Sequence, residues 1–397
     1  MLKLCKLCLV SGAIILANAG GGFTPTLYAQ EKTENAYKAD IADIDAQIEK
    51  GVKYLISRAN EDGSIGSKET PNPGITGLAV LAISKTSLKE PNRATLNKAA
   101  DFILKGKDPK DNSYGGSFKK LSNYFTSVAI MALASLDKEK YKEEVAQTTK
   151  YLKSSQTSED DGTFTKDSWQ YGGFNYNEKG EKAPDLNNTG FALSAFNAAE
   201  LSKDDEAWKR AIVFLQRVHN SPEVSDLEKV KPGSKLLNDG GAMYFPGNTK
   251  GEEIKNADGT LSYPSYGSMT YQLMQSYLFA GIPKDDKRVK ETMRYISNNF
   301  TLETNPGLPE KQAKEGLFNY YRIMAEALNA LGEQKVETAK GKRIVWAQDL
   351  AKHLKGLQKE NGSWANSGSP RWMEGDPDLV TAYSILALVA CRDNLSK

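Results

Sequence analysis

Two aspartates near the C-terminal end of the chain are candidates for acid chemistry. They lie in the run Arg371-Trp372-Met373-Glu374-Gly375-Asp376-Pro377-Asp378. Because Asp376 precedes a proline, its backbone is biased toward an extended conformation. In extended backbone, alternate side chains point to the same side, so Asp376 and Asp378 could share one proton and act as a general acid. The alternative is that Asp378 caps a helix beginning at Leu379, with Asp376 solvated or paired with Arg371.

Aromatic and polar residues in the loops and at the starts of apolar segments are candidates for a ligand site. Aromatic linings suit isoprenoid chains and equally suit sugars, while packing between repeats is the simpler role for any one ring. Arg322 is a charge within an apolar segment, so it pairs with Glu326 four residues on or reaches a ligand. The candidate ligand-binding residues are Trp169, Tyr171, Phe174, Asp185, Tyr244, Tyr266, Tyr320, Tyr321, Arg322, Trp372 and Glu374.

The composition excludes several classes of function. The 397 residues include 52 Lys and Arg against 50 Asp and Glu, so the chain has no basic excess for nucleic acid. Three Cys and two His leave little material for a metal centre and none for a disulfide framework, and no phosphate-binding or dinucleotide motif appears. We therefore expect no metal, no cofactor and no nucleic-acid partner. His219 and His353 fall in predicted outer helices and are expected to be structural or solvent-facing.

The first residues have the pattern of a secretory signal peptide. Lys3 and Lys6 precede an apolar stretch over residues 7–19, which is too short to span a bilayer comfortably. Cleavage could follow Ala19 or Ala29, and we favour Ala29 because the polar chain begins directly after it. We expect a signal peptide over residues 1–29, a polar lead over 30–42 and a protein that is periplasmic or secreted. An uncleaved N-terminal anchor is the alternative.

Six apolar segments repeat along the remaining chain, and an amphipathic segment precedes each. The apolar ones share the pattern Thr-x-x-small-x-x-Ala, which places small residues on one helical stripe where a neighbouring backbone can approach. Helices that are apolar on nearly every face must be buried all round. The apolar segments begin near residues 74, 124, 188, 269, 318 and 379, and the amphipathic ones span 45–57, 96–104, 141–152, 207–218, 288–298 and 346–357.

This alternation predicts an all-α fold in which about six helical hairpins form one domain over residues 43–397. The apolar segments form an inner ring and the amphipathic ones an outer ring, so the predicted architecture is an α/α toroid. An open solenoid would need polar capping repeats, and the last repeat is as apolar as the first. We expect the axis of the ring to be a hollow with apolar and aromatic walls.

The sixth repeat resembles the Gln-Trp repeat of squalene and oxidosqualene cyclases. The resemblance rests on Leu354-Lys355-Gly356-Leu357-Gln358 followed by Asn361-Gly362-Ser363-Trp364, in phase with the six apolar segments, and covers residues 43–392. It implies the α/α toroid that these cyclases share with protein prenyltransferase β subunits. The family's triterpene cyclases have two such domains, whereas this chain has room for one.

The resemblance does not carry over the family's catalytic motif. Those cyclases have an Asp-x-Asp-Asp run before the Thr-Ala that opens an inner helix, and its middle Asp donates the proton. Registered on Thr381-Ala382, that position falls on Leu379, so Asp376 and Asp378 are out of frame. The zinc ligands of the prenyltransferases have no counterpart at the starts of the inner segments.

Three functional hypotheses follow. The first is an exported squalene-cyclase-like protein that holds an apolar, isoprenoid-type ligand in its central cavity, with acid-initiated cyclisation as its reaction if it is an enzyme. The second keeps the toroid as a non-catalytic binding or interaction protein. The third is a carbohydrate-active toroid acting on a glycan, for which Glu374 and Asp185 are the candidate carboxylates. Peripheral contact with a membrane is a further option for the partner.

Overall fold

The computed structural model describes residues 25–115, 118–161, 164–176 and 183–397. Contacts divide the chain into two units, residues 1–39 and 40–397, and helix α1 (Pro25–Ser57) runs through the boundary between them. Most of the predicted signal peptide, residues 1–24, lies outside the described residues, so cleavage and export stay predictions. Within the described part of the chain, no helix combines the length and the apolar character needed to cross a bilayer.

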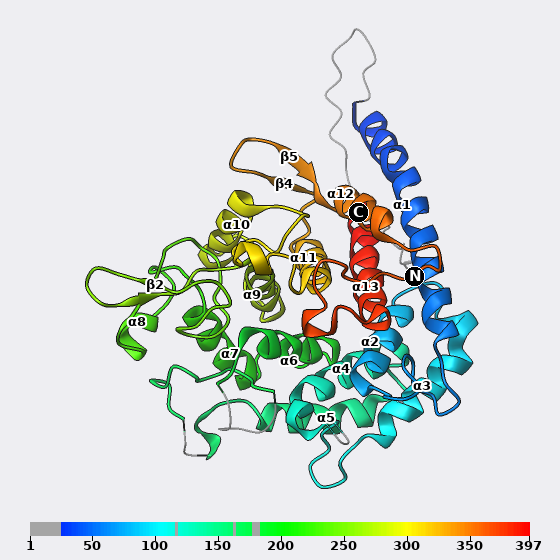
Figure 1. Cartoon of the computed structure of the whole chain (residues 1–397), viewed down its shortest axis with the longest axis horizontal. Coiled ribbons are helices and arrows are strands. Elements are labelled where there is room, and N and C mark those ends of the chain that lie inside the picture. Colours follow the sequence, from blue (N-terminus) through cyan, green and yellow to red (C-terminus); the bar gives the residue numbers. More distant parts are fainter. Residues whose placement is uncertain (1–24, 116–117, 162–163, 177–182) are drawn as a thin grey trace, which may run out of the picture. The chain divides into compact units, whose positions relative to one another are not determined.

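Of the described residues, six helices form a closed inner ring (Figure 1). Each packs against the next in chain order, and the last packs against the first as well as against its predecessor. These helices are apolar and almost fully buried, as their sequence pattern predicts. They are α2 (Pro73–Ser84), α4 (Ser122–Leu136), α6 (Leu186–Ala198), α9 (Gly267–Phe279), α11 (Leu317–Leu331) and α13 (Pro377–Leu395). The closed toroid predicted from the repeats is confirmed.

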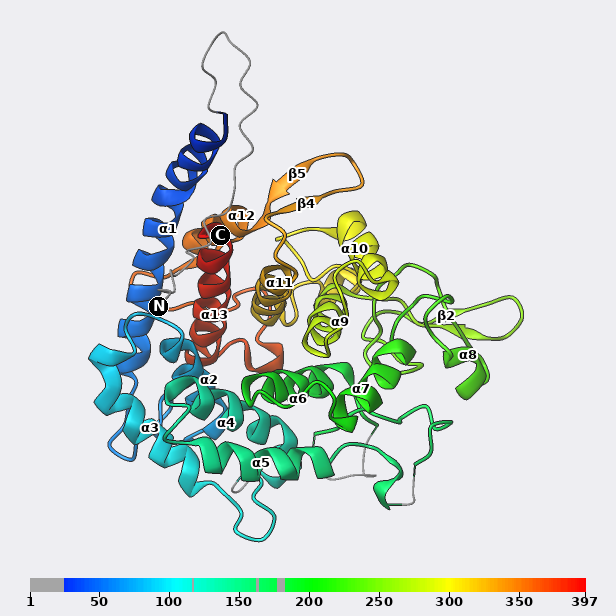
Figure 2. The same ribbon diagram turned by 180° about the vertical axis from the view of Figure 1, so that it is seen from behind.

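Amphipathic helices surround this ring, and each turns one face to it (Figure 2). In α7, for example, Trp208, Phe214 and Leu215 are buried while Glu206 and Lys209 face solvent. The outer layer consists of residues 40–57 of α1, α3 (Arg93–Lys105), α5 (Lys142–Ser154), α7 (Glu206–Arg217), α10 (Lys287–Asn299) and α12 (Trp346–Leu357).

The repeated threonine joins each loop to its inner helix. In α13, the hydroxyl of Thr381 accepts the backbone N–H of Trp364 at 3.1 Å. A buried backbone donor without a partner would be costly, so this hydroxyl explains why the position is kept polar within an apolar helix. The same bond joins Thr76 to Ile65, Thr126 to Tyr114, Thr189 to Phe174 and Thr270 to Ala242.

The Gln-Trp segment closes the ring by joining the last repeat to the first. Gln358 donates from Nε2 to the carbonyl of Gln47 in α1 and to that of Gly362, each at 3.0 Å. Gly362 has φ +88°, and a Cβ there would lie 2.4 Å from the carbonyl oxygen of Lys50. Only glycine permits this approach between the loop and α1. Trp364 fills the space behind, where its Nε1 donates to the carbonyl of Leu354 at 2.8 Å.

Short additional helices, strands and 3-10 turns lie within the loops. The connection between α7 and α9 carries α8 (Leu227–Val230) and a small sheet of order β1-β3-β2, in which β1 (Ser234–Lys235) runs parallel and β2 (Ile254–Lys255) antiparallel to β3 (Leu261–Ser262). A hairpin of β4 (Lys335–Glu337) and β5 (Arg343–Val345) joins α11 to α12. Five 3-10 turns complete the described elements: η1 (Glu90–Asn92), η2 (Lys119–Leu121), η3 (Glu159–Asp161), η4 (Glu310–Gln312) and η5 (Arg371–Met373).

Candidate functional site

The long connections of the chain all lie at the end of the ring where the inner helices begin. Because each leads from an outer helix into an inner one, the connections 155–185, 218–266 and 358–376 reach the same face. We call this the loop face. The connections at the opposite face are mostly shorter. The fold therefore brings Asp185, Tyr244, Trp372 and Glu374 to one end of the toroid, as the sequence predicts.

Asp185 is a buried carboxyl at this face, where it caps α6. Its Oδ1 accepts the N–H of Asn188 at 2.8 Å and its Oδ2 accepts Nδ2 of the same residue at 2.7 Å. The residue is only 2% exposed. Burial raises the pKa of Asp185 to about 6, although the hydrogen bonds from Asn188 and Tyr244 act in the opposite direction. A carboxyl of this kind can both donate and accept a proton near neutral pH.

Three phenols surround the Asp185 carboxyl. The hydroxyls of Tyr176 and Tyr244 lie 3.4 Å apart. Burial, followed by the charge of Asp185, raises the pKa of each of Tyr176, Tyr244 and Tyr266. These tyrosines therefore stay protonated and serve as hydrogen-bonding or stacking groups rather than as bases. Together with Asp185, Asn188 and Lys250 they form what we call the Asp185 site.

Lys250 supplies a cation to this site. Its Nζ lies 4.1 Å from the centroid of the Tyr244 ring, in cation–π geometry. Burial lowers the pKa of Lys250, the negative charge of Asp185 opposes that effect, and the positive charge of Arg371 adds to it. Among residues that the structure describes, no carboxylate or carbonyl pairs with this ammonium group within hydrogen-bonding distance.

The axis of the ring is crossed by a polar network centred on Arg322. The guanidinium, whose side chain is 6% exposed, donates from Nη1 to Glu326 Oε2 at 2.9 Å and from Nη2 to Asn319 Oδ1 at 2.9 Å. It also lies 5.0 Å from the ring centroid of Phe191 on α6 and 5.3 Å from that of Tyr383 on α13. The predicted pairing of Arg322 with Glu326 is confirmed.

The network extends from α11 to α9. Gln275 donates to Glu326 at 3.2 Å, and Gln272 donates to Gln275 at 3.1 Å. Gln272 lies against Gly190 of α6, where a Cβ would be 2.1 Å from its amide carbon. The prediction that the axis is a uniformly apolar, aromatic-walled hollow is therefore wrong, because amide and charged side chains cross it.

Asp376 and Asp378 have separate partners, so the predicted sharing of one proton is wrong. Asp376 is half-buried and caps α13, accepting the N–H of Asp378 at 2.8 Å, and burial raises its pKa. The buried Asp378 accepts from Nε of Arg58 at 3.1 Å, so its charge is neutralised by a residue at the end of α1. The alternative prediction, in which Asp378 caps a helix that begins at Leu379, is also wrong. Helix α13 begins at Pro377, and its N-cap residue is Asp376.

Glu374 is a structural carboxylate. It accepts the backbone N–H groups of Phe318 at 3.2 Å and Asn319 at 2.7 Å, and Nδ2 of Asn366 at 2.7 Å. It thereby caps α11, whose own N-cap residue is Gly316 with φ +62°. Burial raises the pKa of Glu374, while its three donors favour the charged form.

Trp372 lies beside this cap and is exposed. Trp372 and Met373 both adopt left-handed backbone, with φ +55° and +65°, and the indole is packed against Gly316. The residue remains 45% exposed, and the guanidinium of Arg371 lies 5.4 Å from the centroid of its ring.

Other predicted site residues pack between repeats. Phe174 packs edge-on against Phe196, and the hydroxyls of Tyr320 and Tyr321 donate to the carbonyls of residues 301 and 302. Trp169 is stacked on Phe245, and Tyr171 is buried within the connection that follows α5. Packing, the simpler role, accounts for these contacts. Both histidines also have packing contacts, His219 with Tyr277 and His353 with Tyr321.

The sequence did not predict three members of the Asp185 site, Tyr176, Asn188 and Lys250. Lys250 precedes a charged, turn-like stretch at residues 252–259, which looks like an exposed insertion. For Asp185 a stronger signal exists in Asp185-Leu186-Asn187-Asn188-Thr189. Registered on Thr189, the acidic run of the cyclases places its first Asp on Asp185 and its other two on asparagines. The position of the proton donor is thus Asn187, which cannot protonate an alkene.

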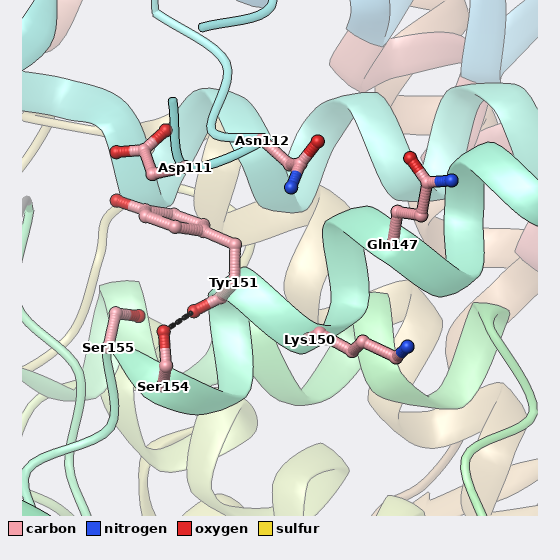
Figure 3. A pocket seen from close by; sticks show the side chains of 7 residues that line it. All are labelled: Asp111, Asn112, Gln147, Lys150, Tyr151, Ser154 and Ser155. Carbon is pink, nitrogen blue, oxygen red and sulfur yellow. Dashed lines mark hydrogen bonds between the residues drawn. The ribbon is translucent and has the colours of Figure 1, made fainter. Parts of the chain in front are cut away.

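A separate cavity of about 710 Å³ lies outside the ring, between α5 and the loop preceding α4 (Figure 3). In Figure 3 the Tyr151 hydroxyl points toward Asp111, while Gln147 and Lys150 lie at the other end. No residue of the Asp185 site contributes to this cavity. Its walls are Asp111, Asn112, Gln147, Lys150, Tyr151, Ser154 and Ser155.

Comparison with known proteins supports the fold assignment. Residues 68–230 match the family model of the squalene-hopene cyclase C-terminal domain. The type II terpene cyclase MstE from Scytonema superposes with a TM-score of 0.55 at 11% identity, covering 89% of this chain and 99% of that chain. An inactive variant of the α-1,6-mannanase from Salegentibacter sp. HEL1_6, in complex with α-1,6-mannotriose, superposes with a TM-score of 0.55 at 12% identity and the same coverage.

No curated protein matches the chain by sequence. At these identities the structural likeness shows the fold alone, and the fold is common to a terpene cyclase and a glycan-cleaving enzyme. The chain therefore has the α/α-toroid fold, and its residues 68–230 resemble the C-terminal domain of squalene-hopene cyclases.

Proposed function

We propose that this protein binds a carbohydrate at the loop face of its toroid, with Asp185 as the group that exchanges a proton with the ligand. The observation that carries the proposal is the buried Asp185 carboxyl, with a pKa of about 6, beside the hydroxyls of Tyr176 and Tyr244 and the ammonium of Lys250. Carboxyl, phenol and ammonium groups are suitable hydrogen-bonding partners for the hydroxyls of a sugar.

The charges of the interior disfavour the chemistry of a polyene. A carbocation would meet the positive charges of Lys250 and Arg322, and like charges repel. The rings of Phe191 and Tyr383, which could stabilise such a cation, already hold the guanidinium of Arg322. An uncharged, hydroxylated ligand does not incur this repulsion.

Exposed aromatic surface at the loop face also suits a sugar. Trp372 is 45% exposed there, and the apolar face of a pyranose can stack on an indole. The mannanase of the same fold has been captured with an α-1,6-linked mannotriose, so a toroid of this kind can hold an oligosaccharide.

We favour binding over hydrolysis because the other acids predicted from the sequence at this face are already occupied. Both glycosidase mechanisms use a pair of carboxyl groups that flank the scissile bond. Glu374 is occupied in capping α11, Asp376 caps α13, and Asp378 is paired with Arg58. None of these three carboxylates is free to act as a second acid beside Asp185.

Acid-initiated cyclisation is the second candidate. It is favoured by the raised pKa of a carboxyl surrounded by phenols and by the family match over residues 68–230. In this version Asp185 takes the place that the sequence analysis gave to Asp376 and Asp378.

Calorimetric titration of the chain with three probes separates the candidates. The probes are α-1,6-mannotriose, trigalacturonate and geranylgeraniol in detergent micelles, and incubation with the last is followed by mass spectrometry of the products. We expect heat of binding with an oligosaccharide, and we expect Asp185→Asn to weaken this binding. The control Asp286→Asn, which changes the cap of an outer helix, should leave the binding unchanged. Binding of geranylgeraniol alone, with a cyclised product that disappears in Asp185→Asn, would establish the cyclase instead.

The proposal includes export of the chain after cleavage at Ala29. It is supported by the basic start and apolar stretch of residues 1–19. Expression of the full chain in a bacterial host, followed by fractionation and N-terminal sequencing, checks it. We expect periplasmic protein that begins at Gln30, whereas cytoplasmic protein that retains the first residues would contradict export.

A further inference from the structure

The cavity beside α5 is a second candidate binding site, separate from the Asp185 site. Its volume of about 710 Å³ falls within the range of small-molecule sites, roughly 300–1,000 Å³. One wall is a face of α5, and the other is formed by residues 111 and 112 of the connection between α3 and α4. We propose that this cavity binds a short peptide with free ends, whose ammonium group lies at Asp111 and whose carboxylate lies at Lys150.

The two ends of the cavity differ in their chemistry (Figure 3). Asp111, Ser154 and Ser155 lie toward one end, and Gln147 and Lys150 lie toward the other. A carboxylate is thus placed at one end of the cavity and an ammonium group at the other. A ligand that carries a cation and an anion at its opposite ends is complementary to this arrangement of charges.

The end at Asp111 offers hydrogen-bond acceptors. Oδ1 of Asp111 accepts the N–H of Ser113 at 2.8 Å, and Oδ2 accepts from none of the residues that the structure describes. The hydroxyls of Ser154 and Ser155 donate to the carbonyls of residues 151 and 152, each at 2.8 Å, so both oxygens present lone pairs to the cavity. A carboxylate accompanied by such oxygens is a suitable partner for an ammonium group.

The end at Lys150 offers hydrogen-bond donors. The exposed ammonium of Lys150 forms no ion pair or hydrogen bond with a described residue. Oε1 of Gln147 accepts from Nζ of Lys107 at 3.3 Å, which leaves the N–H groups of Gln147 Nε2 for a ligand. Lys107 is itself paired with Glu144 at 2.8 Å, so its charge is neutralised within the fold. An unpaired ammonium beside an amide N–H can bind a carboxylate.

The wall between the two ends suits a peptide backbone. Tyr151 donates from its hydroxyl to Oγ of Ser122 at 3.1 Å, which holds its ring in place as an apolar surface. The side chain of Asn112 hydrogen-bonds to no described residue, and its amide contains both donors and an acceptor. Because a peptide group carries one N–H and one C=O, such an amide can pair with it in both directions.

The spacing of the lining residues on α5 indicates the length of the ligand. Gln147, Lys150, Tyr151 and Ser154 recur at the intervals that place side chains on one face of a helix. From Gln147 to Ser154 the helix rises by about 10 Å. An extended peptide rises about 3.3 Å per residue, so a peptide of about three residues spans the same distance.

Peptides with free and blocked ends test the inference. The full chain is titrated calorimetrically at pH 7 and low salt with trialanine, with N-acetyl-trialanine and with trialanine amide. We expect trialanine to bind at least about tenfold more tightly than either blocked form, because each block removes a charge-assisted hydrogen bond. Dialanine and pentaalanine should both bind more weakly than trialanine, because the separation of their charged ends does not match the cavity.

Two variants assign each end of the peptide to one residue. Asp111→Asn, which can still accept the N–H of Ser113, should weaken trialanine about tenfold and leave N-acetyl-trialanine unchanged. Lys150→Gln should weaken trialanine about tenfold and leave trialanine amide unchanged. The control Lys142→Gln, an exposed change in the first turn of α5, should alter none of these affinities. Circular dichroism confirms that each variant is folded.

Several results would overturn the inference. Absence of trialanine binding, or equal affinity for its free and blocked forms, would show that the cavity does not recognise the ends of a peptide. An unchanged affinity for trialanine in Asp111→Asn or Lys150→Gln would contradict the assignment of that end. Cellotriose that binds as tightly as trialanine would overturn the assignment to a peptide. The proposed function is tested independently, since the cavity and the Asp185 site share no residue.

Discussion

Arg322 on α11 lies over the ring of Phe191 on α6, 5.0 Å from its centroid, although these two helices are not neighbours in the inner ring. The contact therefore spans the interior of the toroid. The guanidinium of Arg322 and its hydrogen-bonding partners occupy the space that a hydrocarbon ligand would need. The polarity of the interior thus distinguishes this toroid from one built around an apolar chain.

Removing the guanidinium should destabilise the fold. In Arg322→Met, Glu326 keeps its bond from Gln275 but loses its charged partner, and Asn319 loses both donors. Breaking a buried ion pair from one side costs about 2–4 kcal/mol of unfolding free energy, which urea denaturation measures. Arg343→Met removes an exposed pair with Glu337 and should cost less than about 0.5 kcal/mol. Equal stability of Arg322→Met and the native chain would contradict the importance of the axial network.

Closure of the ring depends on a glycine in the sixth repeat. In Gly362→Ala the new Cβ would meet the carbonyl oxygen of Lys50 at 2.4 Å, in a backbone with φ +88°. We expect a loss of about 2–4 kcal/mol in unfolding free energy, from strain at this φ and displacement of α1. Chemical denaturation followed by circular dichroism provides the measurement.

Gly356, six residues earlier, provides the matched control. It lies within α12, and a Cβ there would meet nothing within 4 Å. Gly356→Ala should therefore raise the stability by about 0.5–1 kcal/mol through helix propensity. If Gly362→Ala and Gly356→Ala changed the unfolding free energy in the same direction, the close contact of Gly362 with α1 would not be required for closure of the ring.

The fold could be predicted because its determinants are local and repeated. Thr381 and its four counterparts stand at the same place in their helices, so a search for repeats finds them before any contact is known. The Gln358–Trp364 segment could likewise be recognised from sequence, since its residues bond one another and the adjacent helix. The periodicity of the sequence and its short motifs are therefore sufficient to predict the architecture.

The site could be predicted only in part, because its contacts are not local. Asp378 is paired with Arg58, 320 residues away, and no spacing along the chain reveals that pair. Lys250 comes from an inserted connection without a repeat to anchor it. Asp185 was found as a candidate, but its burial, which raises its pKa, depends on the packing of Tyr244 and Tyr266 from other repeats.

The two aspartates at the start of α13 should be dispensable for ligand binding. In Asp376→Asn the asparagine can accept the same N–H from residue 378, since Asn and Asp are comparable N-caps. We expect the unfolding free energy to change by less than about 0.5 kcal/mol and the affinity for an oligosaccharide to stay the same. If Asp376→Asn lost as much affinity as Asp185→Asn, the result would show that Asp376 belongs to the binding site.

The titration of Asp185 should appear in the stability of the protein. Its pKa is about 6 in the fold against an ordinary value of 3.8, so between these values the folded state binds more protons than the unfolded state. Stability therefore falls as the pH rises from about 4 to 6, and the cost levels off above 6 at about 3 kcal/mol at most. The neighbouring phenols Tyr176, Tyr244 and Tyr266 do not titrate in this window, because burial raises the pKa of each.

Asp185→Asn removes this titration while it retains the cap of α6. If the variant and the native chain have similar unfolding free energies at pH 4.5, the variant should be the more stable of the two by up to about 2 kcal/mol at pH 7.5. Urea denaturation at several pH values measures the difference. Asp286→Asn is the control, because the bond to Arg288 lowers the pKa of Asp286 to about 2, so its effect should be constant across the same range. Parallel pH profiles for Asp185→Asn and the native chain would mean that Asp185 is ionised across the whole pH range. That result would contradict the proposed proton exchange at the loop face.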